Sequence, residues 1–202
     1  MGYRMRVIFL QENRLLRSLL VMVNKLMSLS FVLALVSGSL FVASCGEKET
    51  DAAAGAQPAG EEGAKIVIQE IIDNPGQAAE LSMKLRPTTE DYAAVFSDAE
   101  FAKKAQEVYD GAWDAGALVV KAKPDQTEIK LFSATTEDLL AGNEKAKQFP
   151  GGFKQVASKF NKGITIYVFK LIKPGEKYGM SFNGLIHVNG HWRIFPKPWR
   201  IK

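Results

Sequence analysis

Cysteine is almost absent from this chain of 202 residues, which has only Cys45, and histidine is nearly as scarce, with only His187 and His191. A single cysteine excludes an intramolecular disulfide framework and leaves no cluster of thiolate ligands for a metal. The sequence also lacks a glycine-rich phosphate loop followed by lysine, and a recognisable serine or cysteine nucleophile motif. It therefore indicates more about location and fold than about chemistry.

Charge is missing from one stretch, residues 26–42, which reads LMSLSFVLALVSGSLFV. A positive start at Lys25, this apolar run and the small residues before Cys45 have the layout of a secretory signal. The tetrapeptide VASC, which ends at Cys45, also matches the lipobox: an aliphatic residue, two small residues and cysteine. Residues 22–45 therefore resemble the signal of bacterial lipoproteins. This resemblance implies cleavage before Cys45 and a diacylglycerol thioether on its sulfur, so that the partner of the mature chain is a membrane.

Two other interpretations of the apolar run remain open, an uncleaved membrane anchor and plain secretion. Serines and a glycine dilute its hydrophobicity and no basic cluster follows it, whereas a membrane span needs about 20 predominantly apolar residues. Residues 1–21 add four arginines ahead of a complete signal, so the true start is either Met1, with a long basic region, or Met22. The resemblance places the protein in the cell envelope, and Gly46 in place of aspartate favours the outer membrane.

The positive net charge of +4 comes mainly from the predicted signal. Five of the 26 basic residues and one of the 22 acidic residues precede Cys45, so the chain from Cys45 onward carries 21 of each. This balance argues against nucleic acid as a partner. One asymmetry survives, because residues 162–202 carry eight basic residues against Glu176 alone. This segment is either a solvated sheet face or a surface for anionic headgroups or an acidic partner.

Composition divides the chain into three predicted parts: a signal peptide over residues 1–44, a lipidated cysteine with a flexible linker over 45–64, and one domain over 65–202. The linker is rich in Ala, Gly and Glu and has no large apolar residue, so it buries too little to offset the entropy of ordering. The remaining 138 residues suit a single core.

The first half of the domain has helical spacing. Residues 65–72 favour a helix over a strand, and residues 77–85 form a second helix that ends before Pro87. The TTED motif at 88–91 can cap a third helix, and Ser97 with Glu100 predicts a capping box for a fourth. The apolar positions of the fourth helix predict its buried face to contain Phe101, Ala105, Val108 and Ala112.

The second half changes to the spacing of strands. We predict strands at 127–133, 164–172, 178–188 and 191–195, and one helix over 153–160. The strand at 164–172 is predicted to lie in the centre of the sheet, because it is β-branched and aromatic. Asn189-Gly190 predicts a two-residue type I′ hairpin, and the two prolines after it predict an extended tail. The fold class is therefore α+β, with N-terminal helices packed on a curved antiparallel sheet and one inserted helix. This element order resembles the cystatin-like and nuclear-transport-factor-like cone, which implies a pocket.

The hairpin decides how the two histidines are interpreted. Its register pairs Val188 with His191 and His187 with Trp192, and neighbouring residues alternate between the faces of a sheet. The histidines therefore point to opposite faces, and we expect no shared metal. His187 is either a half-buried packing residue or an acid/base group in a pocket. Asp91 and the pair Asp110 and Asp114 are interpreted as helix caps or as part of a solvated helix face.

These observations leave two functional hypotheses. The first is a lipid-anchored envelope protein whose domain binds a small molecule, a peptide or another envelope protein without catalysis and without a cofactor. Its candidate surface consists of His187, Trp192, Arg193 and Trp199. The alternative is a small envelope hydrolase or isomerase that uses His187 or a buried aspartate as general base.

Overall fold

The computed structural model describes residues 57–202, which belong to one compact unit, Thr50–Lys202. The predictions for the signal and for Cys45 lie outside these residues. The elements, in chain order, are α2 (Gly60–Asp73), α3 (Ala78–Met83), α4 (Thr89–Val95), α5 (Ala99–Asp114), β1 (Glu128–Thr135), α6 (Thr136–Ala141), α7 (Gly152–Val156), β2 (Thr165–Ile172), β3 (Gly179–Val188) and β4 (His191–Ile194). Short 3₁₀ turns lie at Pro75–Gln77, Ala146–Gln148, Ala157–Lys159 and Pro198–Arg200.

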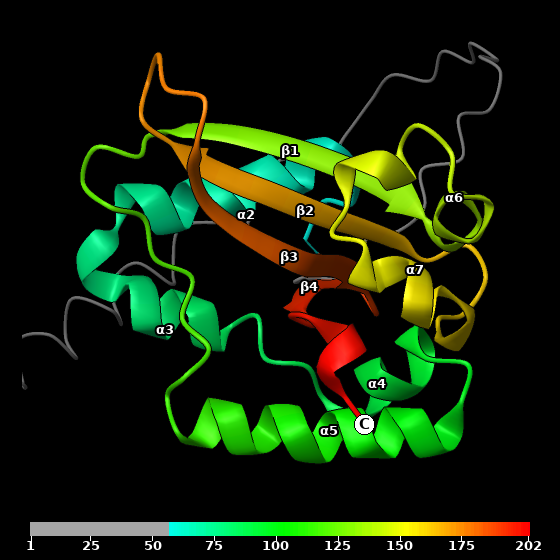
Figure 1. Ribbon diagram of the computed structural model, residues 1–202. Coiled ribbons are helices and arrows are strands. Elements are labelled where there is room, and N and C mark those ends of the chain that lie inside the picture. Colours follow the sequence, from blue (N-terminus) through cyan, green and yellow to red (C-terminus); the bar gives the residue numbers. More distant parts are fainter. Residues whose placement is uncertain (1–56) are drawn as a thin grey trace, which may run out of the picture. The chain divides into compact units, whose positions relative to one another are not determined.

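The strands form one antiparallel sheet in the order β1-β2-β3-β4, and this confirms the predicted α+β class (Figure 1). β2 lies between β1 and β3 and is buried along most of its length, as its β-branched and aromatic sequence predicted. The β3–β4 hairpin has the predicted register, with Val188 opposite His191 and His187 opposite Trp192. Asn189 and Gly190 have φ of 51° and 79°, the left-handed values that a type I′ turn requires.

A β-bulge in β3 brings the end of β4 close to the middle of that strand. The register between β2 and β3 shifts at Tyr167 and Val168, opposite Gly184, which has φ of +84°. A Cβ at Gly184 would lie 2.0 Å from the carbonyl oxygen of Phe195. The Phe195 N–H donates to the Gly184 carbonyl at 2.8 Å. Glycine therefore permits a close approach that leaves the Phe195 side chain fully buried.

The N-terminus of α4 is capped as predicted, because the backbone N–H of Thr88 donates to Asp91 Oδ2 at 2.8 Å. The predicted cap of α5 was wrong by one residue. Its N-cap is Asp98, whose Oδ1 accepts from the Phe101 N–H at 3.0 Å, while Ser97 Oγ donates to the Lys159 carbonyl at 3.2 Å.

The predicted buried face of α5 also needs correction. The helix buries Ala102, Ala105, Tyr109 and Trp113, whereas Val108 is 48% exposed. The two aromatic side chains remove much more surface from water than Val108 and Ala112 could, and they therefore set the rotation of the helix.

Two helices, α6 and α7, separate β1 from β2, where one was predicted. α6 repeats the TTED motif of α4: Thr135 N–H donates to Asp138 Oδ2 at 2.9 Å and Asp138 N–H to Thr135 Oγ1 at 3.1 Å. Gly142, with φ of +63°, ends this helix. The chain end is not extended as predicted, because it contains the 3₁₀ turn Pro198–Arg200.

The ordered domain begins earlier than the predicted boundary at residue 65. α2 starts at Gly60, and Gly63 and Ala64 are buried. Glu61 and Glu62 occupy the first helical turn, where acidic side chains interact favourably with the helix dipole, so acidic residues expected in a linker instead start a helix.

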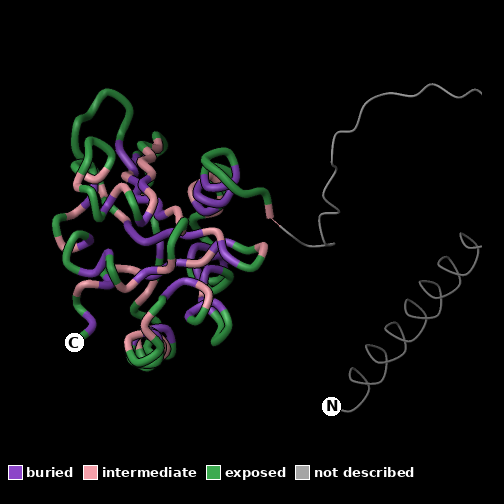
Figure 2. The backbone as a smooth tube through the Cα atoms, turned by 90° about the vertical axis from the view of Figure 1, so that its right-hand side faces the viewer, coloured by how far each residue is buried: buried purple, intermediate pink, exposed green. Residues whose placement is uncertain are grey.

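The described residues contain one hydrophobic core, from Ala64 to Ile201, and a core of its own is what a part of a chain needs to fold independently. Figure 2 shows its buried segments in the interior and exposed segments along the periphery. Among residues 57–202, no helix combines the length and the apolar character needed to cross a membrane.

Candidate functional site: a groove between α4 and α5

Two of the predicted surface residues, His187 and Trp192, hold the segment that precedes α2. Gln57 donates from its N–H to the Gly190 carbonyl at 2.9 Å, and its Oε1 accepts from the Trp192 N–H at 3.0 Å. His187 Nε2 contacts the Gln57 carbonyl at 2.9 Å, and Trp192 Nε1 donates to the Pro58 carbonyl at 3.0 Å. We call these five residues the N-terminal clamp. Because a carbonyl only accepts, His187 Nε2 carries a hydrogen in this contact.

Arg193 lies on the opposite face of the hairpin and pairs with Asp91. Its Nε donates to Asp91 Oδ2 at 2.7 Å, and Asn189 Nδ2 donates to Asp91 Oδ1 at 2.8 Å. Burial alone would raise the pKa of Asp91, but these hydrogen bonds and that from Thr88 N–H outweigh it and hold the pKa below its ordinary value. Asp91 is therefore a buried, ionised structural group, in keeping with its predicted role as a helix cap.

Trp199 has a third, separate role. Its ring packs edge-on against Phe153, with the ring centroids 5.0 Å apart, and a Cβ at Gly152 would lie 2.3 Å from it. The chain end thereby closes over α7. The structure thus does not bring the four residues of the predicted surface together, because they form three different internal contacts.

The remaining candidates also have structural partners. Asp110 and Asp114 both pair with Arg86, at 3.0 and 2.8 Å. Within residues 57–202, no three His, Cys, Asp or Glu side chains gather closely enough to hold a metal ion.

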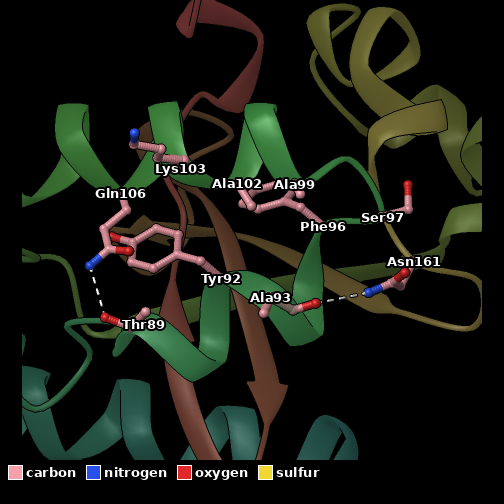
Figure 3. A pocket seen from close by; sticks show the side chains of 10 residues that line it. All are labelled: Thr89, Tyr92, Ala93, Phe96, Ser97, Ala99, Ala102, Lys103, Gln106 and Asn161. Carbon is pink, nitrogen blue, oxygen red and sulfur yellow. Dashed lines mark hydrogen bonds between the residues drawn. The ribbon is translucent and has the colours of Figure 1, made fainter.

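A groove of about 500 Å³ lies between α4 and α5 (Figure 3). It is larger than a second hollow of about 280 Å³ beside α6 and α7. The groove has an apolar floor with polar groups around it. Its lining comes from both helices, the turn between them and one residue beyond α7. The lining residues are Thr89, Tyr92, Ala93, Phe96, Ser97, Ala99, Ala102, Lys103, Gln106 and Asn161.

The two helices present their walls with the same sequence spacing. α4 and the residue after it supply positions 89, 92, 93 and 96, and α5 supplies positions 99, 102, 103 and 106. Each set follows the i, i+3, i+4, i+7 pattern that places residues on one helix face. Small alanines on both walls keep the groove open, because a larger side chain there would fill it.

Three polar side chains define the chemistry of the groove. Gln106 Nε2 donates to Thr89 Oγ1 at 2.9 Å and so links the two walls. Lys103 forms no ion pair within the described part of the chain, although lysines elsewhere in it do. The hydroxyl of Tyr92, a residue only 2% exposed, has no hydrogen-bond partner in the described structure.

The Tyr92 ring is fixed by its aromatic neighbours. It stacks on Tyr109 with centroids 6.2 Å apart and meets Phe195 edge-on at 5.5 Å. Burial raises the pKa of the hydroxyl far above its ordinary value, with the negative charge of Asp110 adding to the effect. The hydroxyl therefore stays protonated and is a buried donor without a partner in the described structure, on a residue that lines the groove.

Comparison of the chain with protein-family models, curated proteins and solved structures found no match. The resemblances to bacterial lipoproteins and to the cystatin-like cone therefore stay predictions.

The sequence interpretation did not identify the groove. The signal that could have found it is the repeated spacing of small and polar residues on the α4 and α5 segments. The predicted buried face of α5 contains Val108 instead of Tyr109, and this error in the rotation of the helix obscures the signal.

Proposed function

We propose that this chain is a lipid-anchored protein of the cell envelope whose domain binds a small amphipathic molecule, without catalysis, in the groove between α4 and α5. The observation that carries the binding role is the groove itself: about 500 Å³, with an apolar floor and a few polar groups. Small-molecule sites have this construction and typically measure about 300–1,000 Å³. The anchor rests on the VASC motif ending at Cys45.

The contacts of the candidate bases favour binding over the alternative enzyme. His187 Nε2 is committed to the Gln57 carbonyl, and the ring packs against Trp192 with centroids 5.1 Å apart. Asp91 accepts three hydrogen bonds and its pKa lies below the ordinary value. A carboxylate held in this way is a poor general base near neutral pH, where a raised pKa would be needed.

The binding role is tested by native mass spectrometry of residues 50–202, purified from cells without refolding. We expect a small-molecule adduct that is lost in Ala93→Trp, because Ala93 is exposed and lines the groove. Ala79→Trp is the matched control, since Ala79 is an exposed helical alanine on α3 outside the groove. An adduct that survives Ala93→Trp would contradict the proposed site. Adduct-free protein that also binds nothing in a fragment screen would contradict the binding role.

The anchor is tested separately by the intact mass of protein extracted from membranes. We expect a chain that begins at Cys45 with a diacylglycerol mass on it, and we expect Cys45→Ser to lack this mass. A mature chain that begins at any other, unmodified residue would contradict lipidation.

A further inference from the structure

The groove has one charged lining residue, Lys103, on its α5 wall. Its neighbour Lys104 is also exposed but does not line the groove. Because Lys103 forms no ion pair within residues 57–202, its charge is available to a ligand. An apolar site with a single positive group at its margin complements a molecule with an apolar body and a single negative group.

The unpaired hydroxyl of Tyr92 provides a second, independent indication. A buried donor without an acceptor is unfavourable, and native proteins rarely leave one unless a ligand or water pairs with it. The Tyr92 ring points toward the end of the groove where Gln106 bonds to Thr89 (Figure 3). Thr89 and Gln106 form an exposed hydrogen bond, which can exchange with water. A ligand acceptor that displaces this bond would enter the end of the groove toward which the Tyr92 ring points.

The floor of the groove determines which apolar body a ligand can have. Tyr92 and Phe96 supply aromatic surface, and Ala93 and Ala102 are too small to fill the space above it. An aromatic ring packs favourably on such a surface in an offset or edge-on geometry.

We propose that the groove takes a small carboxylate with an aromatic or alkyl body, with Lys103 as the counter-charge and the Tyr92 hydroxyl as the hydrogen-bond donor. This inference rests on the proposed binding function and specifies its ligand class. A carboxylate offers the negative charge for Lys103 and accepting oxygens for Tyr92 in one group.

The test uses 4-phenylbutanoate as the probe, because it carries one carboxylate on a short apolar body. The neutral 4-phenylbutanamide and the cationic 4-phenylbutylammonium are its controls. Binding to ¹⁵N-labelled residues 50–202 is followed by the shifts of backbone amides in α4 and α5. We expect the carboxylate to bind about three- to tenfold more tightly than the amide, and the ammonium more weakly still.

Variants separate the two polar roles. Lys103→Met should weaken carboxylate binding about three- to tenfold and leave amide binding unchanged, whereas Lys104→Met should alter neither. Tyr92→Phe should weaken both probes, because both carry an acceptor. Equal binding of carboxylate and amide, or equal effects of Lys103→Met and Lys104→Met, would overturn the ligand class while groove binding stands. If no probe shifts these amides, the ligand class also fails, and the adduct experiment with Ala93→Trp still decides the binding role independently.

Discussion

Arg193 on β4 donates from Nε to Asp91 Oδ2 at 2.7 Å and so joins the last strand of the sheet to the first turn of α4. The same guanidinium donates from an Nη to the Lys84 carbonyl at 2.7 Å, which lies just after α3. The side chains of Asp91 and Arg193 are only 2% and 15% exposed. Since α4 forms one wall of the groove, this buried pair fixes that wall relative to the sheet.

Replacing Asp91 by Ala should lower the free energy of unfolding by about 3–5 kcal/mol, because it leaves the Arg193 charge buried without its partner. Chemical denaturation with urea measures this change. Lys147→Ala is the control, since Lys147 and Glu144 form an ion pair whose side chains are 62% and 86% exposed. Such exposed pairs contribute about 0–1 kcal/mol. Equal losses in the two variants would show that the Asp91 pair is not structurally important.

Stability should fall as the pH drops below about 4, and Asp91 should contribute to this fall. Because its pKa is lowered in the folded state, the unfolded chain binds more protons between the two pKa values. The stabilisation is therefore present above the unfolded pKa and is lost as the pH falls through the folded pKa. Urea unfolding at pH 7 and pH 3 should show a smaller difference for Asp91→Asn than for the native chain. An undiminished difference would assign the effect to other carboxylates, such as Asp98 and Asp138.

Gly184→Ala and Gly175→Ala should differ in stability although their φ angles are almost equal, at +84° and +83°. Gly175 has no heavy atom near its would-be Cβ, so Ala there suffers only backbone strain, about 1–2 kcal/mol. At Gly184 the Cβ would also collide with the Phe195 carbonyl, which adds about 1–3 kcal/mol. Thermal and urea unfolding of the two variants measure the difference. Matching stabilities would mean that the bulge relaxes freely.

Tyr92→Phe should leave the free energy of unfolding unchanged or raise it, because it removes a buried hydroxyl without a partner. Tyr109→Phe is the matched control, since the Tyr109 hydroxyl donates to the Pro196 carbonyl at 3.1 Å. Its removal should destabilise the domain by about 1 kcal/mol. Both variants are compared by urea unfolding in the absence of ligand. A clear loss for Tyr92→Phe would show that the hydroxyl is already paired, which would weaken the inferred ligand contact.

The sheet was predictable from the sequence because its signals are local. The alternation of residues 127–133, the β-branched run of 164–172 and the Asn189-Gly190 turn each specify backbone geometry over a few residues. The register at His187 and Trp192 follows from the turn alone. The start of α4 was predictable for the same reason, since its capping box spans four residues.

The errors arose where distant contacts decide the outcome. The first described residues, Gln57 and Pro58, are held by His187 and Trp192, which lie 130 and 134 positions later in the chain. The rotation of α5 depends on the burial of Tyr109, whose hydroxyl reaches Pro196. The groove depends on how α4 and α5 pack together, and no single segment determines that packing. The pairing of Asp91 with Arg193 likewise joins residues that are adjacent only after folding.

The N-terminal clamp also has a mechanical consequence. A force applied at Gln57 acts on a residue that is held by three hydrogen bonds to the β3–β4 hairpin. Pro58 adds a fourth through the indole of Trp192. These four hydrogen bonds must break before the force acts on α2. Tension on the N-terminal side is therefore transmitted into the hairpin, at the opposite face from Arg193, before it can pull directly on the helices that form the groove.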